Sequence, residues 1–149
     1  MKKILWIILP LCMVAGAVTA ENTIPAPINP VDLSWISPPG IPGVHIAWVL
    51  GAEQRTGLYS LRVKLDQGAM IPPHQHPDER NSTVLSGTLY VGFGDVIDES
   101  KLVAVKNGAV YIAPADVAHY LYAKDEDVVY QESGYGPTGT VVLTQPREE

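Results

Sequence analysis

Two histidines stand two residues apart in a proline-rich stretch, and residues of this type at this spacing can bind a metal ion. They are His74 and His76 in the segment Pro-Pro-His-Gln-His-Pro. On extended backbone, alternate side chains point to the same face, so the two imidazoles could share one ligand. Nitrogen donors suit zinc, iron, copper or nickel. Such pairs also occur in surface loops without metal, so the pair alone leaves both readings open.

A third histidine, His119, lies 45 residues beyond His74 and follows a strand-like run. The two stretches together resemble the two sequence motifs of the cupin family. The first motif (glycine, five residues, His-x-His, three or four residues, glutamate, six residues, glycine) is matched, apart from its glutamate, by Gly68, His74, His76 and Gly87. The second is matched by Gly108, Pro114 and His119, whereas Asp116 and Ala123 replace its second glycine and its asparagine.

This resemblance covers roughly residues 45–146. It implies an all-β double-stranded β-helix, the jelly-roll barrel of cupins, with the site inside the barrel. It also implies that His74, His76 and His119 are the ligands of one divalent metal ion, which could be iron, zinc, manganese, nickel or copper. A barrel whose histidines only fill its mouth and bind no metal is the alternative.

The chain departs from the first motif at its glutamate, because that position falls on Arg80 and Glu79 comes one residue too early. A slip of one residue reverses the face to which a strand residue points. Either a bulge turns Glu79 inward, where it would complete three histidines and a carboxylate, or Arg80 points inward. An inward Arg80 could bind a substrate carboxylate through two hydrogen bonds, whereas an outward Arg80 would be an ordinary solvated charge.

The segments that position these residues are predicted to be β-strands. Tyr59, Leu61, Val63 and Leu65 alternate with polar residues, as a strand with one buried face requires, and no stretch keeps a period of 3.6. Further strands are predicted at 44–50, 83–93, 102–105, 109–112, 119–123, 128–132 and 139–143. Turn residues, among them Gly68, Gly108 and Gly134, separate the strands. Many short strands predict a sandwich or closed barrel over residues 44–149.

Before this domain, residues 21–43 form a proline-rich N-terminal arm. Proline recurs in it at Pro25, Pro27, Pro30, Pro38, Pro39 and Pro42, which excludes a helix or a central strand. The arm is either a solvated linker or a segment that lies across the barrel edge or a neighbouring subunit. In the second case Leu33, Trp35 and Ile36 would be its buried anchors.

Residues 1–20 have the features of a signal peptide. Two lysines precede an apolar run at residues 4–17, and Val18-Thr19-Ala20 offers the small residues of a cleavage site. The run contains Pro10 and is shorter than the roughly 18 residues that a membrane-spanning helix needs. We therefore expect an exported protein in the periplasm or outside the cell. Since Cys12 is the only cysteine, the exported chain would have neither disulfides nor cysteine catalysis.

Charge restricts the partners. The chain carries a net charge of −6, and removal of the first 20 residues leaves 8 basic and 16 acidic residues. Because this surplus repels phosphate backbones, nucleic acid is excluded as a partner, and no membrane contact is expected once the signal is removed. We expect a small-molecule ligand or substrate, and both the family resemblance and the arm permit a homodimer.

Three functions remain open. The first is a metal-dependent enzyme that acts on a small organic molecule, and similarity to the thiol-oxidising cupins, which also use three histidines, makes a dioxygenase conceivable. The second is a cupin that binds a metal or small ligand without turnover. The third is a metal-free isomerase with His74 or His119 as general base. The remaining histidine, His45, is expected to be structural, and the tyrosines near the second motif are expected mainly to pack.

Overall fold

The computed structural model describes residues 26–143, so the predicted signal peptide at residues 1–20 lies outside the described residues, as does the start of the arm. Within the described range, no helix has both the length and the apolar character that crossing a bilayer requires. The regular elements among residues 26–143 are ten strands and two short 3-10 helices, η1 (Pro30–Asp32) and η2 (Glu99–Lys101).

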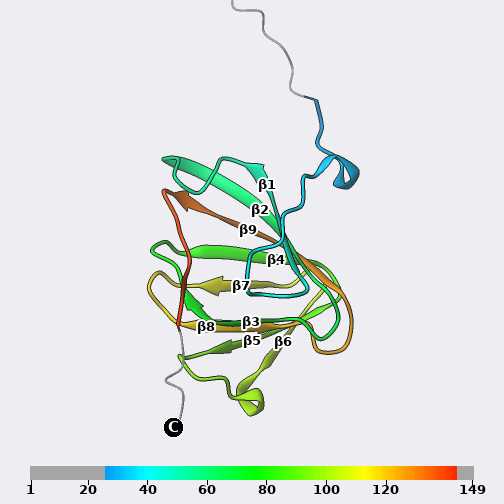
Figure 1. Cartoon of the computed structure of the whole chain (residues 1–149), viewed down its shortest axis with the longest axis vertical. Helices are drawn as coiled ribbons and strands as arrows, with labels where there is room; N and C mark the ends of the chain where they lie inside the picture. Colours follow the sequence, from blue (N-terminus) through cyan, green and yellow to red (C-terminus); the bar gives the residue numbers. More distant parts are fainter. Residues whose placement is uncertain (1–25, 144–149) are drawn as a thin grey trace, which may run out of the picture.

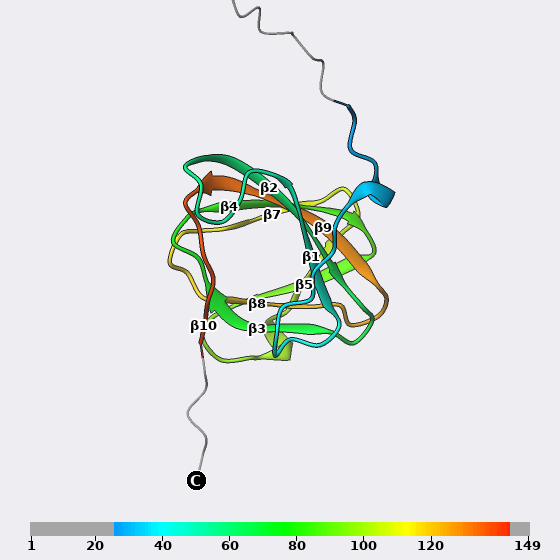
Figure 2. The ribbon, with the colours of Figure 1, turned by 45° about the horizontal axis from the view of Figure 1, so that its top comes forward.

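The strands form two antiparallel sheets that face each other and enclose the core (Figures 1 and 2). The first sheet has the order β1 (Val44–Leu50), β2 (Gly57–Leu65), β9 (Val128–Gly136), β4 (Arg80–Ser86) and β7 (Val110–Ala113). The second has the order β10 (Val141–Val142), β3 (Met70–Gln75), β8 (His119–Tyr122), β5 (Thr88–Phe93) and β6 (Val103–Lys106). The all-β jelly-roll fold that the sequence predicted is confirmed.

The alternation of apolar and polar residues in β2 gives the strand one buried face, as the sequence predicted. Tyr59, Leu61, Val63 and Leu65 are all buried, and β9 pairs with β2 along its whole length. Their side chains meet the inward residues of both sheets, which include Val84, Leu89, Leu121, Val128 and Tyr130. Burial of these side chains between the two sheets provides the main stabilisation of the fold.

The single strand predicted at residues 83–93 is wrong, because the structure has two strands there. Gly87 separates β4 from β5 with a φ of +76°, a conformation that glycine adopts without the strain that a Cβ brings. A Cβ at this position would also collide with the carbonyl oxygen of Asp127. The chain therefore leaves the first sheet at Gly87 and enters the second.

The turn predicted at Gly134 is also wrong, because β9 continues through this residue to Gly136. Glycine is required here for a steric reason. A Cβ on Gly134 would meet the Tyr59 ring, with its Cζ only 2.7 Å away, and would also meet Asp78. Glycine within a strand therefore marks a close approach of neighbouring side chains rather than a reversal.

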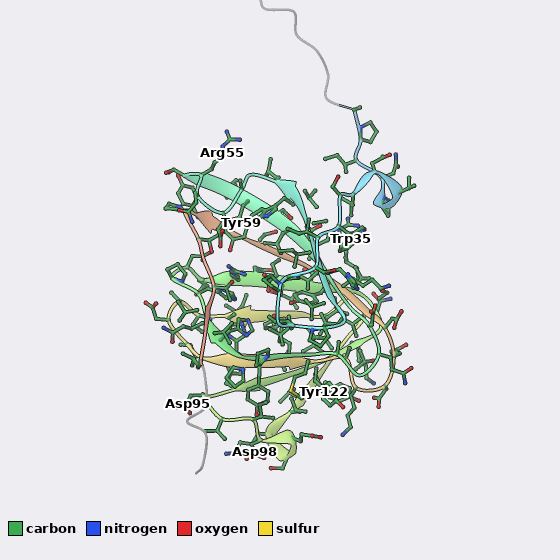
Figure 3. All side chains as sticks on the ribbon, viewed as in Figure 1. Trp35, Arg55, Tyr59, Asp95, Asp98 and Tyr122 are labelled. Carbon is green, nitrogen blue, oxygen red and sulfur yellow. The ribbon has the colours of Figure 1, made fainter. Side chains whose placement is uncertain are left out.

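The arm lies against the barrel and is held mainly by its backbone. Ile36 and Ile46 of β1 exchange backbone hydrogen bonds of 2.9 and 2.8 Å, and Ile41 packs against the core. In Figure 1 the arm descends along β1, and its last residues loop across the front of the barrel. Trp35, labelled in Figure 3, remains 38% exposed, and Ile36 remains 56% exposed, so these two predicted anchors are not buried.

Candidate metal centre

The three histidines come from two neighbouring strands of the second sheet. His74 lies near the end of β3 and pairs directly with His119, the first residue of β8, while His76 follows β3 immediately. The register shifts between Ile71 and His74. This bulge in the proline pair lets His74 and then His76 point into the barrel.

The imidazoles are buried and close enough to share one ion. Their exposed fractions are 2% for His74, 3% for His76 and 0% for His119. The ring centroids are 4.2 Å apart for His74 and His119, 4.9 Å for His74 and His76, and 5.3 Å for His76 and His119. One ligand nitrogen from each ring lies within 4.8 Å of the others. Two nitrogens that each lie about 2.1 Å from one tetrahedral metal ion are about 3.4 Å apart, so the rings would have to move closer together to bind the ion.

Backbone carbonyls determine which ring nitrogen is free. Nδ1 of His74 lies 2.7 Å from the oxygen of Pro72, Nδ1 of His76 lies 2.8 Å from that of Gly139, and Nδ1 of His119 lies 3.1 Å from that of Val117. Because a carbonyl oxygen can only accept, each Nδ1 carries the hydrogen and donates it. Each Nε2 then presents a lone pair, which is the arrangement that metal-binding histidines use.

Two of these Nε2 atoms need a partner. Those of His76 and His119 are buried without any hydrogen-bond partner among residues 26–143. A buried polar atom without a partner costs about 1–3 kcal/mol, so its retention calls for an explanation. A divalent metal ion would satisfy both atoms, and the residues present therefore fit such an ion.

Burial keeps the imidazoles neutral. Desolvation, followed by the charge of His119, lowers the pKa of His74 to about 4, and desolvation, followed by the charge of Arg80, lowers the pKa of His76 to about 3. The pKa of His119 is also lowered, chiefly by desolvation. Since only a neutral imidazole has the lone pair that binds metal, these shifts leave the ligands ready at neutral pH.

Glu79 and Arg80 take opposite faces. Arg80 is 5% exposed and lies on the inward face of β4, as Ser82 and Val84 do. Glu79 comes just before the strand and is exposed. The alternative in which a bulge turns Glu79 inward is therefore not the arrangement in the structure, and the carboxylate stands outside the histidine cluster. The one-residue slip decides this outcome, because side chains alternate between the two faces of a strand.

The guanidinium of Arg80 is engaged within the protein. Its Nη1 donates to Oε2 of Glu132 at 2.7 Å, and its Nη2 donates to the Thr138 hydroxyl at 2.8 Å and to the Gly139 carbonyl at 3.2 Å. Its Nε is 3.8 Å from Asp78, beyond hydrogen-bond distance. Both terminal nitrogens therefore have partners, whereas Nε is buried without a hydrogen-bond partner among the described residues. A substrate carboxylate that approached the two terminal nitrogens together, as the sequence suggested, would compete with Glu132 and Thr138 for them.

Sequence reasoning missed Glu132, Thr138 and Gly139. Glu132 is 3% exposed and pairs with Arg80, while the Gly139 carbonyl accepts from both His76 and Arg80. The alternation of Val128 and Tyr130 with Glu132 on β9 could have revealed the glutamate, because it places Glu132 on the inward face. No comparable pattern marks the carbonyl of Gly139, since any residue type supplies one.

A cavity of about 380 Å³ opens beside the cluster. His74, His76, Arg80 and Glu132 line its polar end. The rest of the wall is mostly apolar and includes residues of β1 and of the arm. A pocket of this size and mixed character suits a small organic molecule.

Tyr120 and His45 make hydrogen bonds away from the cavity. The Tyr120 hydroxyl accepts from the backbone N–H of Asp98 at 3.0 Å and donates to its carbonyl at 2.9 Å, which ties the loop containing η2 to β8. Figure 3 shows Asp98 in that loop, at the end of the molecule opposite Arg55. His45 lies between Ser37 and Asp66, at 2.9 and 3.3 Å. Neither residue lines the cavity.

Known proteins resemble this chain in sequence and in fold. The family model for the cupin domain matches residues 61–130. Germin-like protein 3-1 from Oryza sativa subsp. japonica is 36% identical over 70 residues, which are 46% of this chain and 31% of that protein. The chain thus spans about a third of the length of the first curated relatives that it matches.

Solved structures share the fold at low identity. The polyketide cyclase RemF from Streptomyces resistomycificus has a TM-score of 0.65 at 15% identity, covering 82% of this chain and 89% of that one. A variant of salicylate 1,2-dioxygenase from Pseudoaminobacter salicylatoxidans, in complex with gentisate, has a TM-score of 0.59 at 14% identity, covering 71% and 31%. Since these proteins are named for different reactions, the common fold leaves the reaction open. The match to the cupin-domain model and the germin-like relatives show that the chain belongs to the cupin superfamily, while the solved structures share its fold.

Proposed function

We propose that this chain is an exported, metal-dependent cupin that acts on a small organic molecule. His74, His76 and His119 hold one divalent ion, and the adjoining cavity admits the substrate. The observation that carries the proposal is the set of three buried imidazoles whose Nδ1 atoms are engaged by carbonyls. This leaves the Nε2 lone pairs of three clustered rings available, and two of these atoms have no partner within residues 26–143.

Oxygen chemistry is the reaction class that we favour. His74, His76 and His119 would hold an iron ion through three neutral nitrogens, and such an ion would supply the redox chemistry that this reaction class needs. The known salicylate 1,2-dioxygenase provides a precedent within the fold. The chain itself orients the metal ligands through Pro72, Val117 and Gly139, and its apolar cavity wall excludes water from the substrate.

Metal content tests the ligand assignment. We expect one equivalent of bound metal in the wild-type protein, measured by elemental analysis, and none in the His74→Ala/His119→Ala double variant. His45→Ala is the matched control, because His45 is outside the cluster and should not affect metal content. Wild-type protein that takes up no iron, zinc, manganese, nickel or copper would overturn the proposal and leave the metal-free isomerase.

Turnover separates an enzyme from a binding protein. Iron-loaded protein should consume oxygen with at least one compound from a panel of small acids, thiols and phenols, whereas zinc-loaded protein should not, because zinc has no redox chemistry. Oxygen uptake is measured with an electrode. Metal-loaded protein that binds compounds of the panel without converting them would instead be a non-catalytic ligand-binding cupin.

Export and partners belong to the same proposal. The secreted form should have the intact mass of a chain that begins at Glu21, measured on protein from the periplasm or the medium. The 8 basic and 16 acidic residues of the exported form disfavour nucleic acid, and the cavity favours a small molecule as the partner. Light scattering on this sample tests the homodimer that the family resemblance permits.

A further inference from the structure

The cavity beside the histidines is lined by both polar and apolar residues, and part of its apolar wall comes from the arm. Ile36, Pro38, Pro39 and Ile41, which we call the arm wall, line the cavity together with His74 and His76. Ile46 and Trp48 of β1 continue the same apolar surface. A proline-rich segment that sequence alone could assign to a linker therefore forms part of the candidate site.

Several contacts hold the arm wall in this place. The paired backbone of Ile36 and Ile46 attaches its first residue to β1. The next residue, Ser37, bonds through its hydroxyl to Nδ1 of His45, whose Nε2 lies 3.3 Å from Asp66. At the other end Ile41 packs against the core. Contacts on both sides of the two prolines fix the wall against the cavity.

The charged groups of the cavity disfavour an anionic substrate group, because its lining has the two carboxylates of Glu53 and Glu132 and the single guanidinium of Arg80. The terminal nitrogens of Arg80 bond to Glu132, Thr138 and Gly139, so the buried cation is already neutralised. The exposed Glu53 adds a negative charge to the lining. The apolar residues of the lining therefore provide the contact available to the rest of a substrate.

We infer that the arm wall is a specificity element, and that the substrate is an amphipathic compound with oxygen donors at one end and an apolar body at the other. The oxygen donors face the metal, and the apolar body lies against the arm wall and β1. This inference rests on the proposed function, because the histidine cluster must hold a metal for the oxygen end to be recognised.

Two probes that share an oxygen-donor end test the inference by isothermal titration calorimetry. Catechol has two adjacent oxygens and little more, whereas 4-tert-butylcatechol adds four apolar carbons. The full chain is loaded with zinc, which binds the oxygens without oxidising the probe. We expect the wild-type protein to bind 4-tert-butylcatechol at least about tenfold more tightly than catechol, since the added carbons are removed from water.

Variants of the arm should reduce this preference without affecting the metal end. Ile36→Asp places a charge in the wall, and Pro39→Asp does so without touching the backbone pair of Ile36 and Ile46. Each should lower the preference for 4-tert-butylcatechol at least about fivefold, while the affinity for catechol changes less than about twofold. Val31→Asp is the control, because Val31 is in the same arm, 88% exposed and outside the cavity lining.

The outcomes distinguish this inference from the proposed function. Suppose that the wild-type protein binds zinc and catechol, but binds both probes with equal affinity or keeps its preference in both arm variants. This result would overturn the role of the arm wall but would not contradict the metal site. Wild-type protein that binds no zinc, or catechol binding that persists in the His74→Ala/His119→Ala variant, would overturn both.

Discussion

Arg80 and Glu132 form a buried ion pair at the polar end of the cavity. Their side chains are 6% and 4% exposed, and Nη1 lies 2.7 Å from Oε2. Two charges removed from water compensate each other only while both are present. The pair also links β4 to β9 and, through Thr138 and Gly139, to the segment that supports His76.

Removing one partner of this pair should be costly. We expect Glu132→Gln and Arg80→Met each to lower the free energy of unfolding by about 3–5 kcal/mol, because each leaves a buried polar or charged group uncompensated. The Arg80→Met/Glu132→Leu double variant should lose less than the sum of the two single changes. Urea denaturation of the metal-free proteins measures all three. Additive losses, or single losses below about 1 kcal/mol, would show that the pair is not coupled.

At the scale of the elements, the passage of the chain from one sheet to the other depends on Gly87. Gly87 and Gly108 both have a positive φ, +76° and +81°. Their surroundings differ, because a Cβ on Gly87 would strike the Asp127 carbonyl and lie 3.2 Å from Val128, whereas nothing lies within 4 Å of a Cβ on Gly108. The two positions therefore separate backbone strain from steric collision.

Alanine at these two glycines should have unequal effects. Gly108→Ala should cost about 1 kcal/mol from the strained backbone alone. Gly87→Ala should cost at least about 2 kcal/mol more, because the ends of β4 and β5 must also move away from Asp127. Thermal unfolding followed by circular dichroism gives both values. Equal losses of stability at the two positions would mean that the connection between β4 and β5 accommodates a side chain at residue 87.

For the whole molecule, metal binding should be coupled to stability, because the three ligands converge only in the folded chain. Free zinc at 100 times its dissociation constant should stabilise the protein by about 2.7 kcal/mol and raise Tm by on the order of 10 °C. A chelator should reverse the shift. The His74→Ala/His119→Ala variant should show no shift, and His45→Ala should respond as the wild type does. These melts are measured by differential scanning calorimetry, and a zinc-independent Tm in the wild type would contradict the coupling.

The sequence by itself determined the class of fold and the residues able to bind metal. Alternation in residues 59–65 requires a strand with one buried face, and the spacing of His74, His76 and His119 within the two motifs identified a cupin barrel. These features are local or follow a motif, so they can be recognised without knowing which segments meet in space.

Only the tertiary structure decided which groups surround the cluster. The facing of Glu79 and Arg80 depends on strand register, which pairing with β7 and β9 establishes. Glu132 and the Gly139 carbonyl reach Arg80 across more than fifty residues of sequence. The arm became part of the cavity because Ile36 pairs with β1. Such long-range contacts leave almost no trace in local residue patterns, since they arise from how the two sheets close on one another.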